Sequence, residues 1–382
     1  MGAALSSLGG YLVSFAIRSS LKPPAEVSLP APRCPFDPPP SYEAAVASPA
    51  APRMQSQLSS LPHAVMAKES VVLVTGGSGM VGKALEAVVK EEGRQGERWR
   101  FISSKDADLT DFQATKALFS REQPTKVIHL AAKVGGLFAN MRGNLEFFRQ
   151  NMAINDNVLA CAYESKVEKV VSCMSTCSMP DKVTYPTTEA MLHNGPPHDS
   201  NAGYAYSKRM IHVLNKGYRE LGCNFTAVIP CNVFGEHDNF SLDDSHVIPG
   251  MIHRLYLAMK AGEEKFTIWG TGEALRQFLY AKDLARLFIW ALDHYDSGEP
   301  LILAVDEEEE VSINQAFATI AEVMGFQGEV VHDLSKSDGQ RKKTASNARL
   351  RELNPGFQFT PFREAMEMTV EWFLANYQTA RI

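Results

Sequence analysis

Tyr204 and Lys208 stand four residues apart, a spacing that places both side chains on one face of a helix. A phenol titrates near pH ~10 in water, and a nearby cation favours the phenolate. We therefore expect Lys208 to bring the pKa of Tyr204 toward neutrality, where the phenol can exchange protons with a sugar hydroxyl or a keto oxygen. Ser175 lies 29 positions before Tyr204, just after the apolar stretch 169–174. Open α/β sheets present reacting groups at such strand ends, so the three residues together predict a catalytic site.

A glycine-rich turn points to the ligand of that site. The apolar stretch 71–75 runs directly into Gly76-Gly77-Ser78-Gly79-Met80-Val81-Gly82, at the start of a helical pattern. Gly76 permits a tight turn, Gly79 lets the backbone approach a diphosphate, and Gly82 lets the helix pack closely on the strand. The free N–H groups of the helix start can bind phosphate oxygens. The context predicts a dinucleotide site formed by Gly76, Gly79, Met80, Val81 and Gly82, with Lys208 available to the nicotinamide ribose.

The second strand indicates which dinucleotide is bound. An NAD-specific fold places an acid at its end, whereas this chain has Ser103, Ser104 and Lys105. Hydroxyl donors and a cation suit a 2′-phosphate, so the sequence favours NADPH. An ordinary exposed turn is the alternative, because Asp106 and Asp108 follow at once. We expect Asp108 and Leu109 to close the next strand, with Asp108 accepting a hydrogen bond from the adenine amino group.

Strands that alternate with helices must position these residues. The apolar runs predict strands at 71–75, 99–103, 126–131, 169–174, 225–230 and 301–305. Apolar residues three and four apart predict helices at 81–92, 111–122, 147–164, 206–221 and 283–295, and later at 248–261, 312–324 and 362–377. This rhythm predicts an α/β fold, a Rossmann-type doubly wound parallel sheet with a smaller C-terminal substrate-binding lobe. We expect the NADP-binding domain at 67–235 plus about 281–305, and the lobe at about 236–280 plus 306–382.

Charge and composition exclude several functional classes. The chain has 382 residues and a formal net charge of −6, which argues against a nucleic-acid partner. No apolar run approaches the ~20 residues of a membrane span. The six cysteines include no Cys-x-x-Cys pair, so we expect no metal site and a reducing, cytoplasmic location.

Residues 1–66 differ in composition from the rest of the chain. They hold eleven of the 21 prolines together with many Ala and Ser residues, which predicts a disordered extension. The start at Gly2 fits an N-myristoylation pattern, and Pro39-Pro40-Ser41-Tyr42 has the form that WW domains bind. An unmodified linker remains the simpler interpretation of both. Without this segment, 34 basic against 41 acidic residues leave a charge of −7.

Several longer motifs carry a family resemblance. Thr75-Gly76-x-x-Gly79-x-x-Gly82, Asp108-Leu109, Leu130-Ala131-Ala132, Ser175 and Tyr204-x-x-x-Lys208 resemble the extended short-chain dehydrogenase/reductase family. Further strings are similar to the GDP-sugar epimerase-reductases of that family: 132–136, 175–177, 237–240, 245–249, and 269–272 through 276–279. The resemblance runs from about Val71 to the C-terminus. It implies epimerisation at carbons 3 and 5 of GDP-4-keto-6-deoxymannose, followed by NADPH-dependent reduction at carbon 4, in a homodimer formed through helices that include 206–221.

The resemblance also assigns roles to residues that composition leaves unexplained. Cys177 matches the family's base and His246 its acid on the opposite face of the sugar, and their free pKa values of about 8.5 and 6.5 suit both roles. Ser175 and Tyr204 are expected to bind the enolate oxygen on carbon 4. Without the resemblance, a buried structural cysteine and a loop histidine would be the plainer interpretations. Lys133 and Asn232 match family positions near the sugar, Asn140 does so less clearly, and Arg276 matches a position that contacts the diphosphate. Arg254, eight residues beyond His246, is a second candidate for the phosphates, and Trp269 is also expected at the substrate.

The chain departs from the family pattern at two positions, and two alternative functions stay open. Cys231 stands where the family has Thr, and Glu236 where it has Pro, so the exact sugar contacts are in doubt. One alternative is another NADP-dependent nucleotide-sugar epimerase or reductase, which would not need Cys177 with His246. The other is a non-catalytic, cofactor-bound scaffold recruited through residues 39–42. Such scaffolds have usually lost the tyrosine or lysine, whereas this chain retains both.

Overall fold

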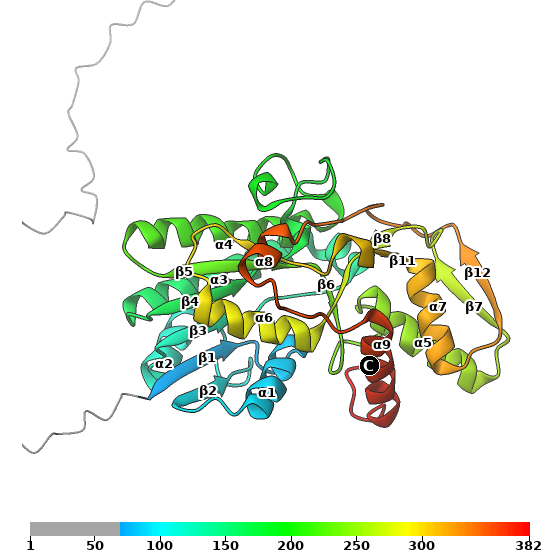
Figure 1. Ribbon diagram of the computed structural model, residues 1–382, viewed down its shortest axis with the longest axis horizontal. Coiled ribbons are helices and arrows are strands. Elements are labelled where there is room, and N and C mark those ends of the chain that lie inside the picture. Colours follow the sequence, from blue (N-terminus) through cyan, green and yellow to red (C-terminus); the bar gives the residue numbers. More distant parts are fainter. Residues whose placement is uncertain (1–68) are drawn as a thin grey trace, which may run out of the picture. The chain divides into compact units, whose positions relative to one another are not determined.

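A six-stranded parallel sheet forms the centre of the fold in the computed structural model, which describes residues 69–382 apart from the side chains of Leu137 and Phe138 (Figure 1). The strand order is β2-β1-β3-β4-β5-β10, and every neighbouring pair is parallel. The strands are β1 (Ser70–Thr75), β2 (Glu97–Phe101), β3 (Lys126–His129), β4 (Lys169–Cys173), β5 (Phe225–Pro230) and β10 (Leu301–Leu303). All six lie within or next to the runs predicted from the sequence, which confirms the expected fold class.

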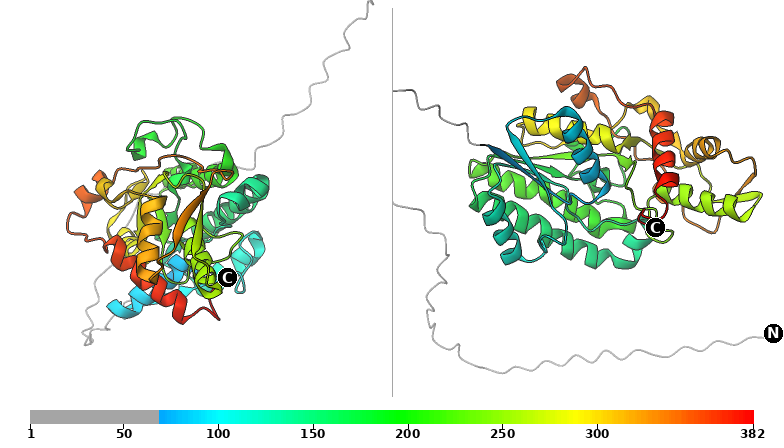
Figure 2. Two further views of the ribbon diagram at one scale, coloured as in Figure 1. Left: turned by 90° about the vertical axis from the view of Figure 1, so that its right-hand side faces the viewer. Right: turned by 90° about the horizontal axis from the view of Figure 1, so that it is seen from below.

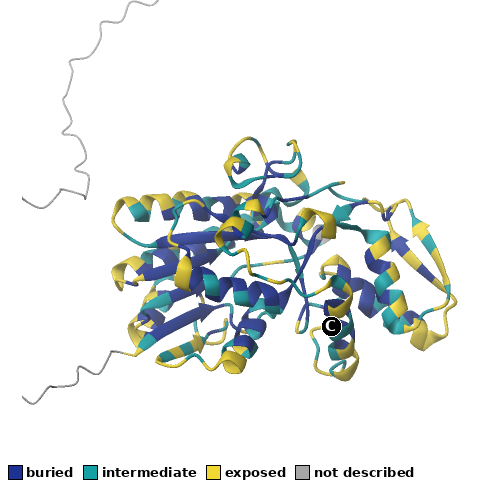
Figure 3. Cartoon of the chain, in the orientation of Figure 1, coloured by how far each residue is buried: buried dark blue, intermediate teal, exposed yellow. Residues whose placement is uncertain are grey.

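Helices cover both faces of the sheet (Figure 2). One face carries α1 (Met80–Glu92) and α6 (Ala281–His294), and the other carries α2 (Phe112–Glu122), α3 (Leu137–Glu164) and α4 (Ala202–Glu220). The position of strand β1 between two cores explains why its sequence is apolar throughout. Val72 and Val74 belong to the core under α1 and α6, while Leu73 belongs to the core under α2 and α3. Strands buried on both faces have no polar side, and Figure 3 shows the central strands as buried.

A second core lies beside the carboxyl ends of the strands. It buries Phe240, Ile252, Phe266, Phe317 and Phe373, which come from distant parts of the chain. Its helices are α5 (Val247–Ala261), α7 (Ile313–Met324) and α9 (Phe362–Ala375), and its short strands are β6 (Asn232–Phe234), β7 (Lys265–Trp269), β8 (Leu275–Arg276), β9 (Phe278–Tyr280), β11 (Val311–Ser312) and β12 (Glu329–Asp333). The stretch around Ala345 and α8 (Ala348–Leu353), expected in this lobe, packs instead into the core of the central sheet, because Ala345 and Leu350 are buried there.

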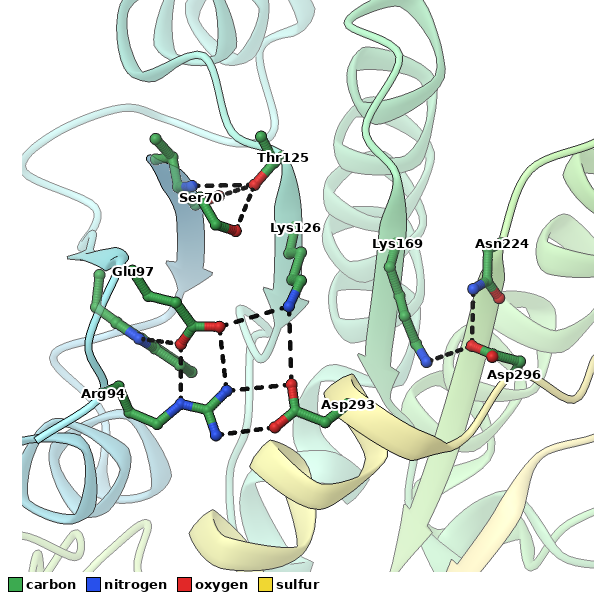
Figure 4. Close-up of polar contacts among 11 residues, drawn as sticks. Ser70, Arg94, Glu97, Thr125, Lys126, Lys169, Asn224, Asp293 and Asp296 are labelled. Carbon is green, nitrogen blue, oxygen red and sulfur yellow. Dashed lines mark hydrogen bonds and ion pairs between the residues drawn. The ribbon is translucent and has the colours of Figure 1, made fainter. Parts of the chain in front are cut away.

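Charged residues form ion pairs and hydrogen bonds where the strands begin, at the end of the sheet opposite the carboxyl ends of the strands (Figure 4). Arg94 donates to Glu97 at 2.8 Å and to Asp293 at the end of α6 at 2.8 Å. Lys126 lies 3.4 Å from Glu97 and 3.7 Å from Asp293. The network joins β2, β3 and α6 on the side away from the glycine-rich turn, so we assign it to stability.

Two local expectations were wrong. The helix predicted at 147–164 begins ten residues earlier, at Leu137, and is kinked at Gly143, where φ is −132° and ψ is 27°. Asp108 and Leu109 do not close a strand. Asp108 accepts hydrogen bonds from the backbone and hydroxyl of Thr110 at 2.9 and 2.7 Å, and this side-chain turn keeps the chain from extending.

Candidate active site

The carboxyl ends of β1 and β3 meet at a crevice, because the chain runs from β1 to β2 on one side and returns to β3 on the other. A cavity of about 1080 Å³ opens there and extends to the second core. It is lined by nearly every residue that the sequence selected: Gly76, Gly79, Met80, Val81, Gly82, Ser104, Asp108, Leu109, Lys133, Ser175, Cys177, Tyr204, Lys208, Asn232, His246, Arg254, Trp269 and Arg276. Lys105 is the exception, since it is exposed and does not line the cavity.

The glycine-rich turn has the shape that a diphosphate requires. Gly76 has a φ of +71°, and a Cβ there would lie 2.9 Å from the backbone nitrogen of Ala131. A Cβ at Gly82 would lie 2.6 Å from the carbonyl oxygen of Gly76, so α1 could not pack this closely on the turn. Gly79 caps α1 without a side-chain hydrogen bond, which leaves the first N–H groups of the helix for a ligand. These residues fit a dinucleotide.

The turn after β2 would face the adenosine end of such a ligand. Ser103 is engaged within the protein, because its backbone N–H and its hydroxyl both donate to Asp106 at 2.8 Å. Ser104 lines the cavity and forms no side-chain hydrogen bond within residues 69–382. Among the residues expected at a 2′-phosphate, Ser104 is therefore better placed than Lys105.

Tyr204 and Lys208 lie on one face of α4, as their spacing predicted, and the Lys208 ammonium lies 5.9 Å from the Tyr204 ring centre. The expectation that Lys208 lowers the pKa of Tyr204 was wrong. Burial raises the pKa of Tyr204, Cys177 and Cys173 add to the effect, and a hydrogen bond with Ser175 opposes it only in part. The Lys208 Nζ instead donates to the Cys173 carbonyl at 2.8 Å. Tyr204 is thus held as a protonated phenol, which can donate a proton.

A buried network positions the helix that carries this pair. His129 at the end of β3 contacts the Thr75 hydroxyl at 2.8 Å and the Asn155 side chain at 3.1 Å. Asn155 on α3 then donates to the Ser207 carbonyl at 3.1 Å, one residue before Lys208. Burial and the charge of Lys208 lower the pKa of His129 to about 3, so its ring stays neutral. Neither His129 nor Asn155 is predicted by the sequence, because their spacing carries no motif.

Cys177 lies in a one-turn 3-10 helix at Thr176–Ser178, and its backbone N–H donates to the Ser175 hydroxyl at 3.2 Å. Burial by itself raises the pKa of Cys177, but the Lys343 charge and hydrogen bonds from Ser175, Lys343 and Asn201 outweigh it, so the pKa is lowered. The Lys343 Nζ lies 3.6 Å from the Cys177 sulfur. Neither Lys343 nor Asn201 is predicted by the sequence, because they lie 166 and 24 positions from Cys177 along the chain and share no motif with it.

His246 precedes α5 as its N-cap and lines the cavity. Desolvation lowers the pKa of His246, and the charges of Lys343 and Arg381 lower it further. The pKa of His246 therefore lies below the value of about 6.5 expected for a free imidazole.

Arg254, Arg276 and the Trp269 ring line the part of the cavity that is formed by the second core. The Arg254 guanidinium lies 4.4 Å from the Trp269 ring centre and 5.0 Å from that of Phe266, and burial lowers its pKa to about 10. Burial also lowers the pKa of Arg276, which keeps one donor on the Leu275 carbonyl at 2.7 Å. Partly desolvated arginines bind phosphates strongly, so this end suits a second phosphorylated ligand.

Three further residues expected at the sugar have partners within the protein. Lys133 pairs with Glu146, Asn232 donates to the Gln277 carbonyl at 2.9 Å, and Asn140 donates to the Gly135 carbonyl at 2.7 Å. The Asn140 side-chain oxygen is buried and has no partner among the described residues, so it is available as an acceptor.

The two departures from the family pattern differ in their surroundings. Cys231 is buried at the cavity wall, and burial raises its pKa to about 12. Glu236 accepts from the Tyr280 hydroxyl at 2.7 Å and does not line the cavity. Glu236 therefore links the segment after β6 to β9 in the second core.

Residues 69–382 contain no group of three or more His, Cys, Asp or Glu side chains arranged to hold a metal ion. None of the helices in this range is both long enough and apolar enough to cross a membrane.

Comparison with known proteins defines the class. The model of the NAD dependent epimerase/dehydratase family matches residues 72–305, so the chain belongs to this family. Among curated relatives, it is 56% identical to a GDP-L-fucose synthase of Dictyostelium discoideum over 311 residues, which cover 81% of this chain and 97% of the relative. It is 54% identical to a probable GDP-L-fucose synthase of Drosophila melanogaster over 317 residues, 81% of this chain and 99% of the relative.

A solved structure extends the comparison to the cofactor. The chain is similar to a GDP-L-fucose synthetase of Naegleria fowleri that was crystallised bound to NADP, with 50% identity and a TM-score of 0.79. The match covers 83% of this chain and 96% of that one. Both the class and this relative agree with the dinucleotide site at Gly76–Gly82.

Proposed function

We propose that this chain converts GDP-4-keto-6-deoxy-D-mannose to GDP-L-fucose, by epimerisation at carbons 3 and 5 and NADPH-dependent reduction at carbon 4. The observation that carries the proposal is one cavity that joins a diphosphate-binding turn, the Tyr204–Lys208 pair, and Cys177 with His246. Relatives at 54–56% identity are named for the same activity.

Cys177 is proposed as the base of both epimerisations. Lys343 favours its thiolate, which takes a proton from the carbon next to the ketone. Charge then develops on the carbon 4 oxygen, where the Ser175 and Tyr204 hydroxyls donate hydrogen bonds. The thiol must release its proton again before the second epimerisation.

His246 is proposed as the acid on the opposite face of the sugar. Desolvation and the charges of Lys343 and Arg381 favour its neutral imidazole. Phosphates bound nearby offset these cations and raise the pKa of His246, so that the imidazole can be protonated when substrate is present. This coupling limits proton donation to the complex with substrate.

Tyr204 is proposed to protonate the carbon 4 oxygen during reduction. When bound, NADPH supplies the hydride for this step. Burial favours the protonated phenol that the donation needs, and Lys208 is proposed to hold the nicotinamide ribose. Gly76, Gly79, Met80, Val81, Gly82, Ser104, Asp108 and Leu109 are proposed to hold the rest of the cofactor, and Lys133, Asn232, Arg254, Trp269 and Arg276 to hold the GDP-sugar.

The test is to incubate the full chain with NADPH and GDP-4-keto-6-deoxy-D-mannose in D2O and to identify the product. We expect GDP-L-fucose with deuterium at carbons 3 and 5. Cys177→Ser should lose deuterium incorporation and product while retaining NADPH binding. Full turnover by Cys177→Ser would refute the epimerase assignment and favour another reductase of the same fold, and absence of turnover by the unaltered chain would favour a scaffold.

We also propose a homodimer formed through α3 and α4. Tyr163, Val213 and Leu221 are 44%, 49% and 61% exposed on these two helices, which pack against each other. An unpartnered apolar surface of this kind favours a second copy of the chain. Light scattering should give twice the chain mass, and Val213→Glu should give a monomer.

The proposed location is the cytoplasm. The five cysteines within residues 69–382 are all free thiols, as a reducing compartment maintains them. The possible WW-domain partner of Pro39-Pro40-Ser41-Tyr42, the proposed disorder of 1–66 and the myristoylation pattern at Gly2 lie outside the described residues. Cell fractionation and the intact mass of the native protein test these points.

A further inference from the structure

The last residues of the chain return to the active-site cavity. After α9, the Tyr377 ring packs on Phe373 and Tyr256 in the second core. The backbone N–H of Phe240 then donates to the Arg381 carbonyl at 2.7 Å, and Asn239 and Arg381 form a parallel β-bridge. Arg381, the penultimate residue, is thereby fixed by its backbone beside the loop that leads to His246.

The Arg381 side chain lines the cavity and has no partner within residues 69–382. It forms neither a hydrogen bond nor an ion pair in this range, unlike Arg254 and Arg276, which each have one donor on a backbone carbonyl. Its charge nevertheless acts on groups in the cavity wall, because it helps to lower the pKa of His246. Arg381 is solvent-exposed at the cavity wall, and a cation there without a protein anion is suited to a ligand anion.

The acid next to this cation does not neutralise it. Asp238 is 3% exposed, its Oδ1 accepts from the Asn239 N–H at 2.7 Å, and its Oδ2 has no partner. Burial raises the pKa of Asp238 to about 7, against the opposing hydrogen bond from Asn239 and the charge of Arg381. The carboxyl therefore carries only part of a negative charge near neutral pH, and Arg381 keeps most of its field.

Arg381 and α1 both lie near His237. Lys83, whose backbone N–H donates to the Gly79 carbonyl at 2.8 Å, acts on the same His237 imidazole as Arg381. Lys83 itself pairs with Glu86 at 2.7 Å and does not line the cavity, so of these two cations only Arg381 is available to a ligand there.

We propose that Arg381 binds a diphosphate in this cavity, so that the C-terminal tail completes the anion site that the start of α1 begins. The planar guanidinium can donate two parallel hydrogen bonds to phosphate oxygens. Both the cofactor and the GDP-sugar carry a diphosphate, and the position near α1 favours the cofactor. The inference rests on the proposed function for the identity of these ligands.

Arg381→Ala in the full chain tests the proposal, because it retains the backbone contact with Phe240 and removes the side chain beyond Cβ, including the guanidinium. Dissociation constants for NADPH, NADH and GDP would be measured by titration at low ionic strength. Loss of one charge-assisted hydrogen-bonding group should weaken NADPH and NADH alike by about 10-fold. Arg381→Lys should recover part of the affinity. Arg363→Ala, which removes one positive charge from α9 outside the cavity, should change nothing.

The dissociation constants for NADPH, NADH and GDP distinguish the two sources of the diphosphate. Weaker NADPH and NADH with unchanged GDP supports the cofactor, and weaker GDP alone supports the sugar nucleotide. Unchanged binding of all three ligands, or a loss confined to NADPH that points to the 2′-phosphate, would overturn the proposal. Thermal unfolding of each variant would show whether a loss of affinity reflects impaired folding. If Arg381→Ala is impaired in folding, the affinity of Arg381→Lys decides whether the guanidinium binds the diphosphate. Failure of the proposed function differs from these outcomes, because the unaltered chain would then form no GDP-L-fucose.

Discussion

The Lys343 ammonium lies 3.6 Å from the Cys177 sulfur, although 166 residues separate the two in the sequence. Lys343 belongs to the stretch that returns from the second core to the central sheet, and Cys177 follows β4. The approach of these two segments turns a partly buried thiol into a group whose pKa is lowered rather than raised.

Lys343→Met should raise the pKa of Cys177, because burial would then act without the opposing cation. The rate of alkylation by iodoacetamide against pH would report the thiolate, with its midpoint moved to higher pH by about one unit or more. The neighbouring Lys342 pairs with Glu310 and does not line the cavity, so Lys342→Met is the matched control. An unchanged midpoint in Lys343→Met would show that Lys343 does not activate the thiol.

Tyr204→Phe should lower the rate of NADPH oxidation with the 4-keto sugar nucleotide by about 100-fold or more, because the proton donor of the reduction is lost. Affinity for NADPH should stay within about two-fold. Tyr206 lies two residues away and is exposed, which makes Tyr206→Phe the control for removal of a hydroxyl from α4. Full reduction by Tyr204→Phe would require another proton donor.

Ser104→Glu should weaken NADPH by about 10-fold and spare NADH, because the new carboxylate would repel a 2′-phosphate at the cavity wall. Lys105→Glu should have the same sign and a smaller effect, since Lys105 does not line the cavity. Titration of each variant with both cofactors gives the comparison. Equal losses for NADPH and NADH would contradict a 2′-phosphate site in this turn.

Glu97→Gln should lower the free energy of unfolding by about 1–2 kcal/mol at pH 7, because Arg94 and Lys126 lose a shared anion. Burial acts to raise the pKa of Glu97, but Arg94 outweighs it, so the folded value lies below the ordinary 4.5. The stabilisation is complete above that ordinary value and is lost as the pH falls through the folded value. Urea unfolding across this range should show the variant and the parent converging in acid.

The control for Glu97→Gln is Glu367→Gln, which removes the charge from an exposed pair with Arg363 and should leave the free energy of unfolding nearly unchanged. Activity of Glu97→Gln should be unchanged, because the network lies at the edge of the sheet away from the cavity. A loss of activity with stability intact would contradict the assignment of this edge to stability.

Local sequence patterns were sufficient to predict the first strand, the glycine-rich turn and the helix face that carries the catalytic pair. The run Val71–Thr75 predicted β1 because a parallel strand is buried on both faces, and the glycines after it predicted the turn that only small residues permit. The spacing of Tyr204 and Lys208 predicted one helix face, because side-chain direction in a helix depends only on position.

Tertiary structure decided the electrostatics, because burial and through-space neighbours have no signature in local spacing. The sequence suggested that Lys208 would acidify Tyr204, whereas folding buries the phenol and directs the ammonium to a carbonyl. The cations Lys343 and Arg381 lie at the site only because the chain, after passing through the second core, returns to the cavity. The sequence by itself thus determined which elements form and which groups could react, and the fold decided the protonation of those groups and the cations around them.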